Sequence, residues 1–354
     1  MSAQPDPPPL EKIEKGLGRL HNLISEVEDI LETLVTNDTE ILEALTQILL
    51  VVPQMQARNE QSHARVIEEM RKEIARLGRM IAPNLPSLRS SQRITDPFLA
   101  ANPEAAILQS LYSYLPDPIA LDIGAHVGDM SRRLLGAGFE VYAFEPNPPT
   151  FDALRRSMEG EKRFHAFPYA VGSGDCTMNL HIAAGTSVGD RYGAPTLFST
   201  LIEHPMPGDL PFTHDVSVPV RTVESLRNAG EIPSRAGLIK IDTEGYDIEV
   251  LRGLGADATP VVMTEYWDGS HSFGSTGMGR LAPIVEEMRD RGYPWHLVIH
   301  HREENGQTAI TYDANCSQTP PNSWGNAIFF RDQPLFAHAH AWCGAMLDIS
   351  GGTL

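Results

Sequence analysis

A glycine-containing turn follows an apolar strand-like run in the stretch "LDIGAHVGD", residues 121–129. Such a turn exposes backbone N–H groups and lets a ligand lie close against the chain. The dinucleotide fingerprint G-x-G-x-x-G would need glycines at positions 126 and 129, where the sequence has His126 and Asp129. The spacing present, D-x-G-x-x-x-G from Asp122 to Gly128, places a carboxylate where a cofactor with a positive amino group would lie. S-adenosylmethionine is such a cofactor.

A second acidic residue ends the next apolar run, "EVYAFEP". Glu145 follows Asp122 by twenty-three residues, near the spacing at which an acidic strand end accepts both hydroxyls of a ribose. The alternatives are a solvated loop carboxylate for Glu145 and a structural turn-capping role for Asp122. The two features together favour a cofactor that contains a nucleoside.

Further charged residues follow two later runs and could serve the reaction. If the cofactor is S-adenosylmethionine, the reaction is a methyl transfer, and a hydroxyl acceptor would need close alignment and a base or a metal ion. "IKIDTEG" offers Lys240, Asp242 and Glu244, which the period of two would place on one strand face. "VVMTEYWDGSH" adds Glu265 and the loop residue His271. We take these five residues as the catalytic candidates.

Each candidate also has a simpler interpretation. Lys240 and Asp242 could form a structural ion pair, since a lysine in an apolar strand needs a partner. Asp242, Glu244 and Glu265 could hold a hard divalent ion, although pairing with Lys240 competes. A lone loop histidine such as His271 is more often solvated. We assign no metal ligand and leave the choice of base open.

Short β-like runs alternate with helical runs beyond residue 100, which is typical of a doubly wound α/β sheet. The strand-like runs are "IALDIG", "EVYAFEP", "FHAFPYAV", "GLIKID" and "PVVMTEY". We expect helices near residues 129–137, 150–158 and 247–254. "WHLVIHHRE" and "NAIFFRD", joined by a long polar loop, predict a closing antiparallel pair.

The second half of the chain resembles the FkbM-type S-adenosylmethionine-dependent methyltransferases over roughly residues 119–332. The motifs are "DIGAHVGDMS", "FEPNPPTFDAL", "YAVGSGD", "FSTL", "VPVRTVESL" and "LIKIDTEGYDIEVLRG". His126 replaces the family's usual Asn, and its "DVEG" reads "DTEG" here, with Thr243. The resemblance implies a class I (Rossmann-like) seven-stranded sheet. It also implies that the cofactor contacts Asp122, Gly124, Gly128 and Glu145, with Asn147 beside the adenosine. We add Ala125 and His126 of the same turn.

A heptad pattern precedes this domain and predicts a coiled coil. Asp38 interrupts the seam, and Asn37 could cap a restarted helix there. Folding back onto the main domain is the alternative; we favour self-association, with the number of strands open. Apolar residues recur at gaps of three and four from 10 to 55: Leu10, Ile13, Leu17, Leu20, Ile24, Val27, Leu31, Leu34, Ile41, Leu45, Ile48, Val52 and Met55.

We therefore expect five segments: a disordered leader (1–9), a helical oligomerisation segment (10–82), a linker (83–100), the methyltransferase domain (101–335) and a C-terminal tail (336–354). The net charge of −18 disfavours a nucleic-acid partner, and no run is long enough to be integral to a membrane. Three scattered cysteines without a C-x-x-C pair favour a cytoplasmic protein.

The leading hypothesis is an O-methyltransferase acting on a hydroxyl of a sugar, glycolipid or glycosylated natural product; this acceptor class comes from the family's range. The alternatives are a coiled-coil assembly protein with a non-catalytic domain and an NAD-dependent oxidoreductase. The missing glycines disfavour the oxidoreductase.

Overall fold

The computed structural model describes residues 101–183, 198–202, 212–256, 258–272, 274, 279–304 and 306–351. The chain divides into two units, residues 1–92 and 93–354, and all described residues belong to the second. The predicted leader (1–9), coiled coil (10–82) and linker (83–100) therefore lie outside the described residues.

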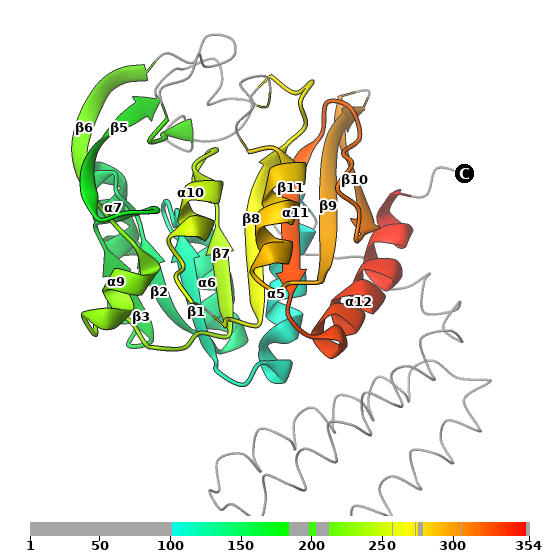
Figure 1. The fold of residues 1–354 in the computed structure, drawn as a ribbon, viewed down its shortest axis with the longest axis horizontal. Coiled ribbons are helices and arrows are strands. Elements are labelled where there is room, and N and C mark those ends of the chain that lie inside the picture. The colour runs from blue at the N-terminus through cyan, green and yellow to red at the C-terminus, as the bar shows by residue number, and fades with distance from the viewer. Residues whose placement is uncertain are drawn as a thin grey trace, which may run out of the picture. The chain divides into compact units, whose positions relative to one another are not determined.

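A mixed sheet of eight strands forms the centre of the described unit, in the order β10-β9-β11-β8-β7-β1-β2-β3 (Figure 1). The five neighbouring strands β8, β7, β1, β2 and β3 are parallel to one another, whereas β11 runs antiparallel to β8 and β9. This confirms the α/β class and the closing antiparallel pair. The bounds are β1 Ile119–Ile123, β2 Glu140–Phe144, β3 Phe164–Phe167, β7 Leu238–Ile241, β8 Val261–Trp267, β9 Trp295–Glu304, β10 Gln307–Ala314 and β11 Trp324–Phe330.

The expectation of seven strands in this sheet was wrong by one. The polar loop predicted between the last two strands contains β10, which pairs antiparallel with β9 at the edge of the sheet. Most residues of β10 are exposed or half-buried, and Ile310 and Tyr312 pack against the core. An edge strand with so few apolar residues has little hydrophobic signal in the sequence.

Helices cover both faces of the sheet because its strands bury alternate residues on opposite sides. In β1, Ala120 belongs to one apolar cluster, whereas Leu121 and Ile123 belong to the other. The first face packs against α5 Pro103–Leu111, α6 Asp129–Ala137, α7 Pro148–Ser157 and α12 Gln333–Gly351. The second packs against α9 Val223–Asn228, α10 Asp247–Arg252 and α11 Leu281–Asp290.

Residues 336–354, expected as a tail, fall largely within α12 instead. Leu335, Ala339, Cys343 and Leu347 of this helix are buried against the core formed with α5. Their spacing of four residues places them on one face of the helix. The C-terminal helix is therefore part of the domain.

A second sheet that the sequence did not predict stands beside the first. It contains β4 Ala170–Val171, β5 Cys176–Ala183 and β6 Phe212–Arg221 in the order β4-β6-β5. β5 and β6 rise above the carboxyl ends of the parallel strands in Figure 1. This sheet has its own small core, which includes Leu180, Ile182 and Val218.

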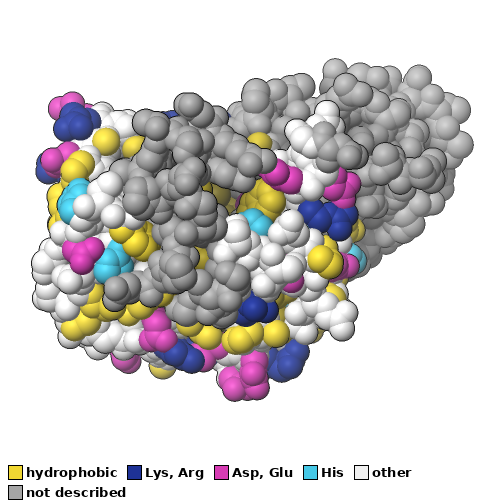
Figure 2. All heavy atoms as spheres, turned by 90° about the horizontal axis from the view of Figure 1, so that it is seen from above, with side chains coloured by type: hydrophobic (Ala, Val, Ile, Leu, Met, Phe, Trp, Pro, Cys, Tyr) yellow, Lys and Arg dark blue, Asp and Glu magenta, His cyan; other side chains and the backbone are white. Residues whose placement is uncertain are grey.

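The surface drawn in Figure 2 carries acidic and basic side chains interspersed around its rim. An interspersed arrangement creates no large field of one sign over the face that is visible. None of the helices in the described part of the chain combines the length and the hydropathy needed to cross a bilayer.

Candidate active site

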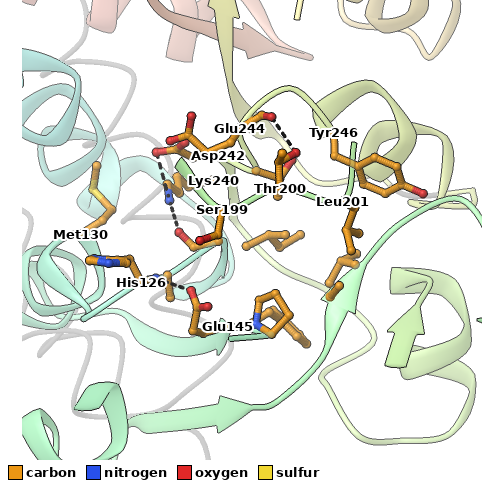
Figure 3. A pocket seen from close by; sticks show the side chains of 18 of the residues that line it. His126, Met130, Glu145, Ser199, Thr200, Leu201, Lys240, Asp242, Glu244 and Tyr246 are labelled. Carbon is orange, nitrogen blue, oxygen red and sulfur yellow. Dashed lines mark hydrogen bonds and ion pairs between the residues drawn. The ribbon is translucent and has the colours of Figure 1, made fainter. Parts of the chain in front are cut away.

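A cleft of about 560 Å³ opens at the carboxyl ends of the parallel strands (Figure 3). Its walls come from the turns that follow β1, β2 and β7, from the start of α5, and from the second sheet with residues 199–201. In an open α/β sheet, ligands bind at this end, because the loops there diverge to opposite faces. The cleft is therefore the candidate site.

The turn after β1 has the left-handed backbone that its glycines allow. Gly124 has φ +76°, and a Cβ atom there would lie 1.8 Å from the backbone oxygen of Asp242. The sequence predicts that the backbone N–H groups of this turn are free for a ligand, but three of them are already bonded within the chain. Gly124 and Ala125 both donate to the carbonyl of Phe144 at 3.0 Å, and Gly128 donates to Ala125 at 2.9 Å. These groups fix the turn against β2.

Glu145 lies at the end of β2, where its carboxylate joins two loops. The backbone N–H of His126 donates to Oε2 and that of Asn147 to Oε1, both at 2.9 Å. The side chain points into the cleft beside His126 (Figure 3). Burial raises the pKa of Glu145 to about 7, although the two N–H groups oppose the shift. Each carboxylate oxygen keeps a lone pair for a further donor.

Asp122 lies beneath the turn and is not among the described residues that line the cleft. Its carboxylate accepts from Ser131 Oγ at 2.5 Å and lies 3.2 Å from Lys240 Nζ. Lys240 also donates to the carbonyl of Gly124 at 2.8 Å and lies 3.5 Å from Asp242. Asp122 therefore orients the lysine and, through it, the turn.

Lys240 does form the ion pair that the sequence suggested, with a second carboxylate added. Burial alone would lower its pKa, but Asp122 and Asp242 outweigh burial and hold the pKa above its ordinary value. The side chain therefore stays an ammonium ion at neutral pH and cannot act as a base.

Glu244 does not continue the strand face as expected, because β7 ends at Ile241. Glu244 has φ +54° in the turn before α10, and Thr200 Oγ1 donates to its backbone carbonyl at 2.9 Å. Its side chain still lines the cleft, beside Asp242 (Figure 3).

Three predicted carboxylates come together at this corner. Oxygen atoms of Asp242, Glu244 and Glu265 lie within 4.8 Å of one another, so they could ligate a hard divalent cation. Burial and the neighbouring carboxylates raise the pKa of Glu244 and of Glu265 well above the ordinary value. Glu265 is not among the described residues that line the cleft.

Sequence reasoning missed Asp247, which organises this corner. Its carboxylate accepts from the N–H and hydroxyl of Thr243, the hydroxyl of Thr264 and the N–H of Glu265, at 2.6–3.0 Å. It thereby ties the β7–α10 turn to β8. Its place at the start of a predicted helix after an acidic turn was the available signal.

Five predicted site residues are not among the described residues that line the cleft: Asp122 and Glu265, already described, and Gly128, Asn147 and His271. Asn147 is buried at the start of α7, where its backbone holds Glu145. The ring of His271 lies 5.5 Å from that of Trp324, and burial lowers its pKa. The lining instead includes Ser199, Thr200 and Tyr246, which lie in the motifs "FSTL" and "LIKIDTEGYDIEVLRG" but were not predicted as site residues.

Comparison with known proteins identifies the domain that contains this cleft. Residues 122–294 match the model of the methyltransferase FkbM domain. The chain contains an FkbM methyltransferase domain. Nearly all the site residues discussed above fall within the matched range, and S-adenosylmethionine is the cofactor of this FkbM domain.

Two relatives of the FkbM domain are methyltransferases. Hexuronic acid methyltransferase AglP of Haloferax volcanii is 29% identical over 144 residues, 39% of this chain and 50% of its own length. Methyltransferase 1 of Beauveria bassiana is 28% identical over 207 residues, 50% of this chain and 76% of its own length. The match thus spans half of the first relative and three quarters of the second.

A solved structure also matches, at low similarity. Precorrin 8W decarboxylase of Methanobacterium thermoautotrophicum is 13% identical with a TM-score of 0.33, covering 64% of this chain and 89% of that one.

Proposed function

We propose that this methyltransferase is an O-methyltransferase whose acceptor is a hydroxyl of a sugar, a glycolipid or a glycosylated natural product. The observation that carries the proposal is the pair Asp242 and Glu244, two carboxylates on the cleft wall that could take the proton of a hydroxyl. An amine or thiol acceptor needs such a group less than a hydroxyl does. The similarity to a hexuronic acid methyltransferase supports a sugar acceptor.

The residues around the first two strands fit the cofactor. Glu145 offers carboxylate lone pairs to the ribose hydroxyls, and Gly124, Ala125 and His126 of the neighbouring turn line the cleft beside it. When bound, S-adenosylmethionine supplies a methyl group on a positively charged sulfur, which suits a cleft lined by carboxylates. Asp122 serves this site by positioning Lys240 and the turn.

The chain's own part in the reaction is to align the hydroxyl, exclude water and accept its proton. A raised pKa means that Glu244, once ionised, holds a proton more strongly than an exposed glutamate would, and it is the ionised form that would take the proton of the hydroxyl. The non-catalytic alternative has no support from these relatives, both of which are methyltransferases.

Substitution of the two carboxylates tests the proposed roles. Asp242→Asn and Glu244→Gln should each lower methyl transfer by about a hundredfold, the scale of losing a general base. Affinity for S-adenosylhomocysteine, measured by calorimetry, should stay unchanged. Glu286→Gln, an exposed change on α11, is the matched control. If both variants keep near-full turnover, the acceptor site lies elsewhere.

A chelator distinguishes a base from a metal ion at the same corner. If a chelator abolishes activity and magnesium restores it, Asp242, Glu244 and Glu265 act as ligands instead.

The acceptor itself can be sought with labelled cofactor. Cell glycan extracts incubated with the protein and S-adenosylmethionine labelled on the methyl group should yield a labelled methyl ether. Label found on nitrogen or sulfur, and none on oxygen, would contradict the proposal.

A further inference from the structure

A polar cluster outside the family motifs adjoins the carboxylate corner of the cleft. It contains Glu104 of α5, Asn326 of β11 and His301 of β9. Glu104 and Asn326 line the cleft, and their side chains meet although they are 222 residues apart in the chain. The fold thus brings three separate elements to one point.

The contacts within this cluster are specific. Asn326 Nδ2 donates to Glu104 Oε1 at 2.8 Å, and His301 Nε2 lies 3.4 Å from Glu104 Oε2. The side chains of Glu104 and His301 are only 5% and 7% exposed. A carboxylate is rarely buried this deeply unless it has a partner or a function.

Hydrogen-bonding capacity remains unused at this point. Glu104 Oε2, Asn326 Oδ1 and His301 Nε2 are buried, and none makes a hydrogen bond to a residue that the structure describes; Glu104 Oε2 and His301 Nε2 face each other at 3.4 Å and pair by charge when the histidine is protonated. Buried polar atoms are normally satisfied, so Asn326 Oδ1 and the remaining lone pair of Glu104 Oε2 need an explanation. Two of the three are oxygen acceptors, and a ligand that satisfies them must bring hydrogen-bond donors.

The strand register places this cluster next to the reaction. Asn326 lies directly opposite Glu265 in the pairing of β11 with β8, so the two side chains share one face of the sheet. Glu265 in turn lies within 4.8 Å of Asp242 and Glu244. A molecule that reaches Asn326 and Glu104 is therefore beside the proposed base.

The charged side chains that line the cleft indicate which class of acceptor it can bind. Its described lining has one lysine or arginine, Lys240, which is already paired with Asp122 and Asp242. That leaves the described lining with no lysine or arginine free to pair with a carboxylate or phosphate on the acceptor. Five carboxylates line the cleft: Glu104, Asp129, Glu145, Asp242 and Glu244.

We propose that Glu104 and Asn326 recognise the acceptor by accepting hydrogen bonds from two hydroxyl groups of a neutral sugar ring. The terminal torsions of Glu and Asn are soft, so both groups can turn toward a ligand without movement of the backbone. His301 positions the Glu104 carboxylate. This inference rests on the proposed function and names its substrate class as neutral polyols, in contrast to the acid named for the archaeal relative.

Binding of small sugars tests the inference without requiring turnover. The probes are methyl glucoside, methyl galactoside, methyl mannoside and methyl glucuronide. Their binding to the full chain, with S-adenosylhomocysteine at saturation, is measured by saturation-transfer NMR. A neutral glycoside should bind more tightly than the glucuronide. Glu104→Gln and Asn326→Leu should each weaken that binding about tenfold or more, the scale of losing a hydrogen bond to a charged or buried partner.

Controls separate recognition from folding. Affinity for S-adenosylhomocysteine should stay within twofold in both variants, and Glu286→Gln should match the wild type in every measurement. If a variant fails to fold, deoxy analogues of the bound glycoside replace it: removing one hydroxyl should weaken binding to the wild type about tenfold.

The outcomes also separate this inference from the proposed function. Binding that depends on Glu104 without any methyl transfer to oxygen supports the inference and contradicts the proposed function. Methyl transfer to a hydroxyl that is unchanged in KM by either substitution overturns the inference alone, as does tighter binding of the glucuronide. Failure of every glycoside to bind overturns it too.

Discussion

Glu145 illustrates how the position of a residue alters its chemistry. Its pKa of about 7 means that the carboxylate changes charge within the physiological range. An ionised carboxylate accepts hydrogen bonds from hydroxyls more strongly than a neutral one. Affinity for S-adenosylhomocysteine should therefore rise between pH 6 and 8 in the wild type. Calorimetry on Glu145→Gln should show weaker binding with a flatter pH profile; an unchanged profile would remove Glu145 from the cofactor site.

The same shift has the opposite consequence for stability. Folding favours the protonated Glu145, because its pKa in the folded chain exceeds the ordinary value. The resulting stabilisation is fully present at acidic pH, below the unfolded pKa, and is lost as pH rises through about 7. The melting temperature should thus fall less between pH 5 and 8 in Glu145→Gln than in the wild type.

Type and spacing were enough to mark Glu145 and Asp242, which the structure places on the cleft wall, while their roles stay predictions. The roles of residues whose chemistry depends on burial were not predictable from the sequence. Asp122 has the right type for contact with a ligand, yet it lies under the turn with Lys240 and Ser131. Glu104 and Asn326 belong to distant segments, and a sequence pattern does not reveal that they touch.

Among the elements, the turn after β1 depends most directly on its glycine. Gly124→Ala would place a Cβ atom 1.8 Å from the Asp242 carbonyl oxygen in a backbone with φ +76°. We expect a loss of about 2 kcal/mol or more in the free energy of unfolding, with loss of cofactor affinity.

Gly136→Ala is the matched control for this change. Gly136 lies in α6, and a Cβ atom there would meet no atom within 4 Å. Alanine should stabilise that helix by about 0.5–1 kcal/mol. Equal effects of the two substitutions in chemical denaturation would contradict the role assigned to the turn.

The C-terminal helix provides a second comparison at this scale. Ala339 is fully buried on the face of α12 that packs against the core, whereas Ala337 is exposed. Ala339→Glu would bury an unpaired carboxylate and should lower the melting temperature by several degrees or prevent folding. Ala337→Glu should leave it unchanged within a degree or two. Similar melting curves for both variants would show that α12 does not contribute to the core.

Elements with a strong apolar period were predictable, and those stabilised by their neighbours were not. α6 begins and ends where the sequence places it, because Gly128 and Gly138 bound an amphipathic run. β10 and the β4-β6-β5 sheet carry mixed side chains, and strand pairing rather than sequence pattern fixes their conformation.

At the scale of the whole molecule, the heptad pattern of residues 10–55 predicts self-association. Apolar residues at gaps of three and four would form a seam whose exposure to water is unfavourable. Burial of this seam between helices would stabilise association by about 25 cal/mol per Å². Light scattering should show an oligomer for the full chain, a dimer or trimer rather than a higher order, and a monomer after deletion of residues 1–82.

Substitution of single positions tests the seam itself. Ile24→Glu and Leu31→Glu should reduce the measured mass, whereas Ser25→Glu and Thr33→Glu, outside the seam, should not. A monomeric full chain, or an oligomer that survives the deletion, would show that the seam has another use.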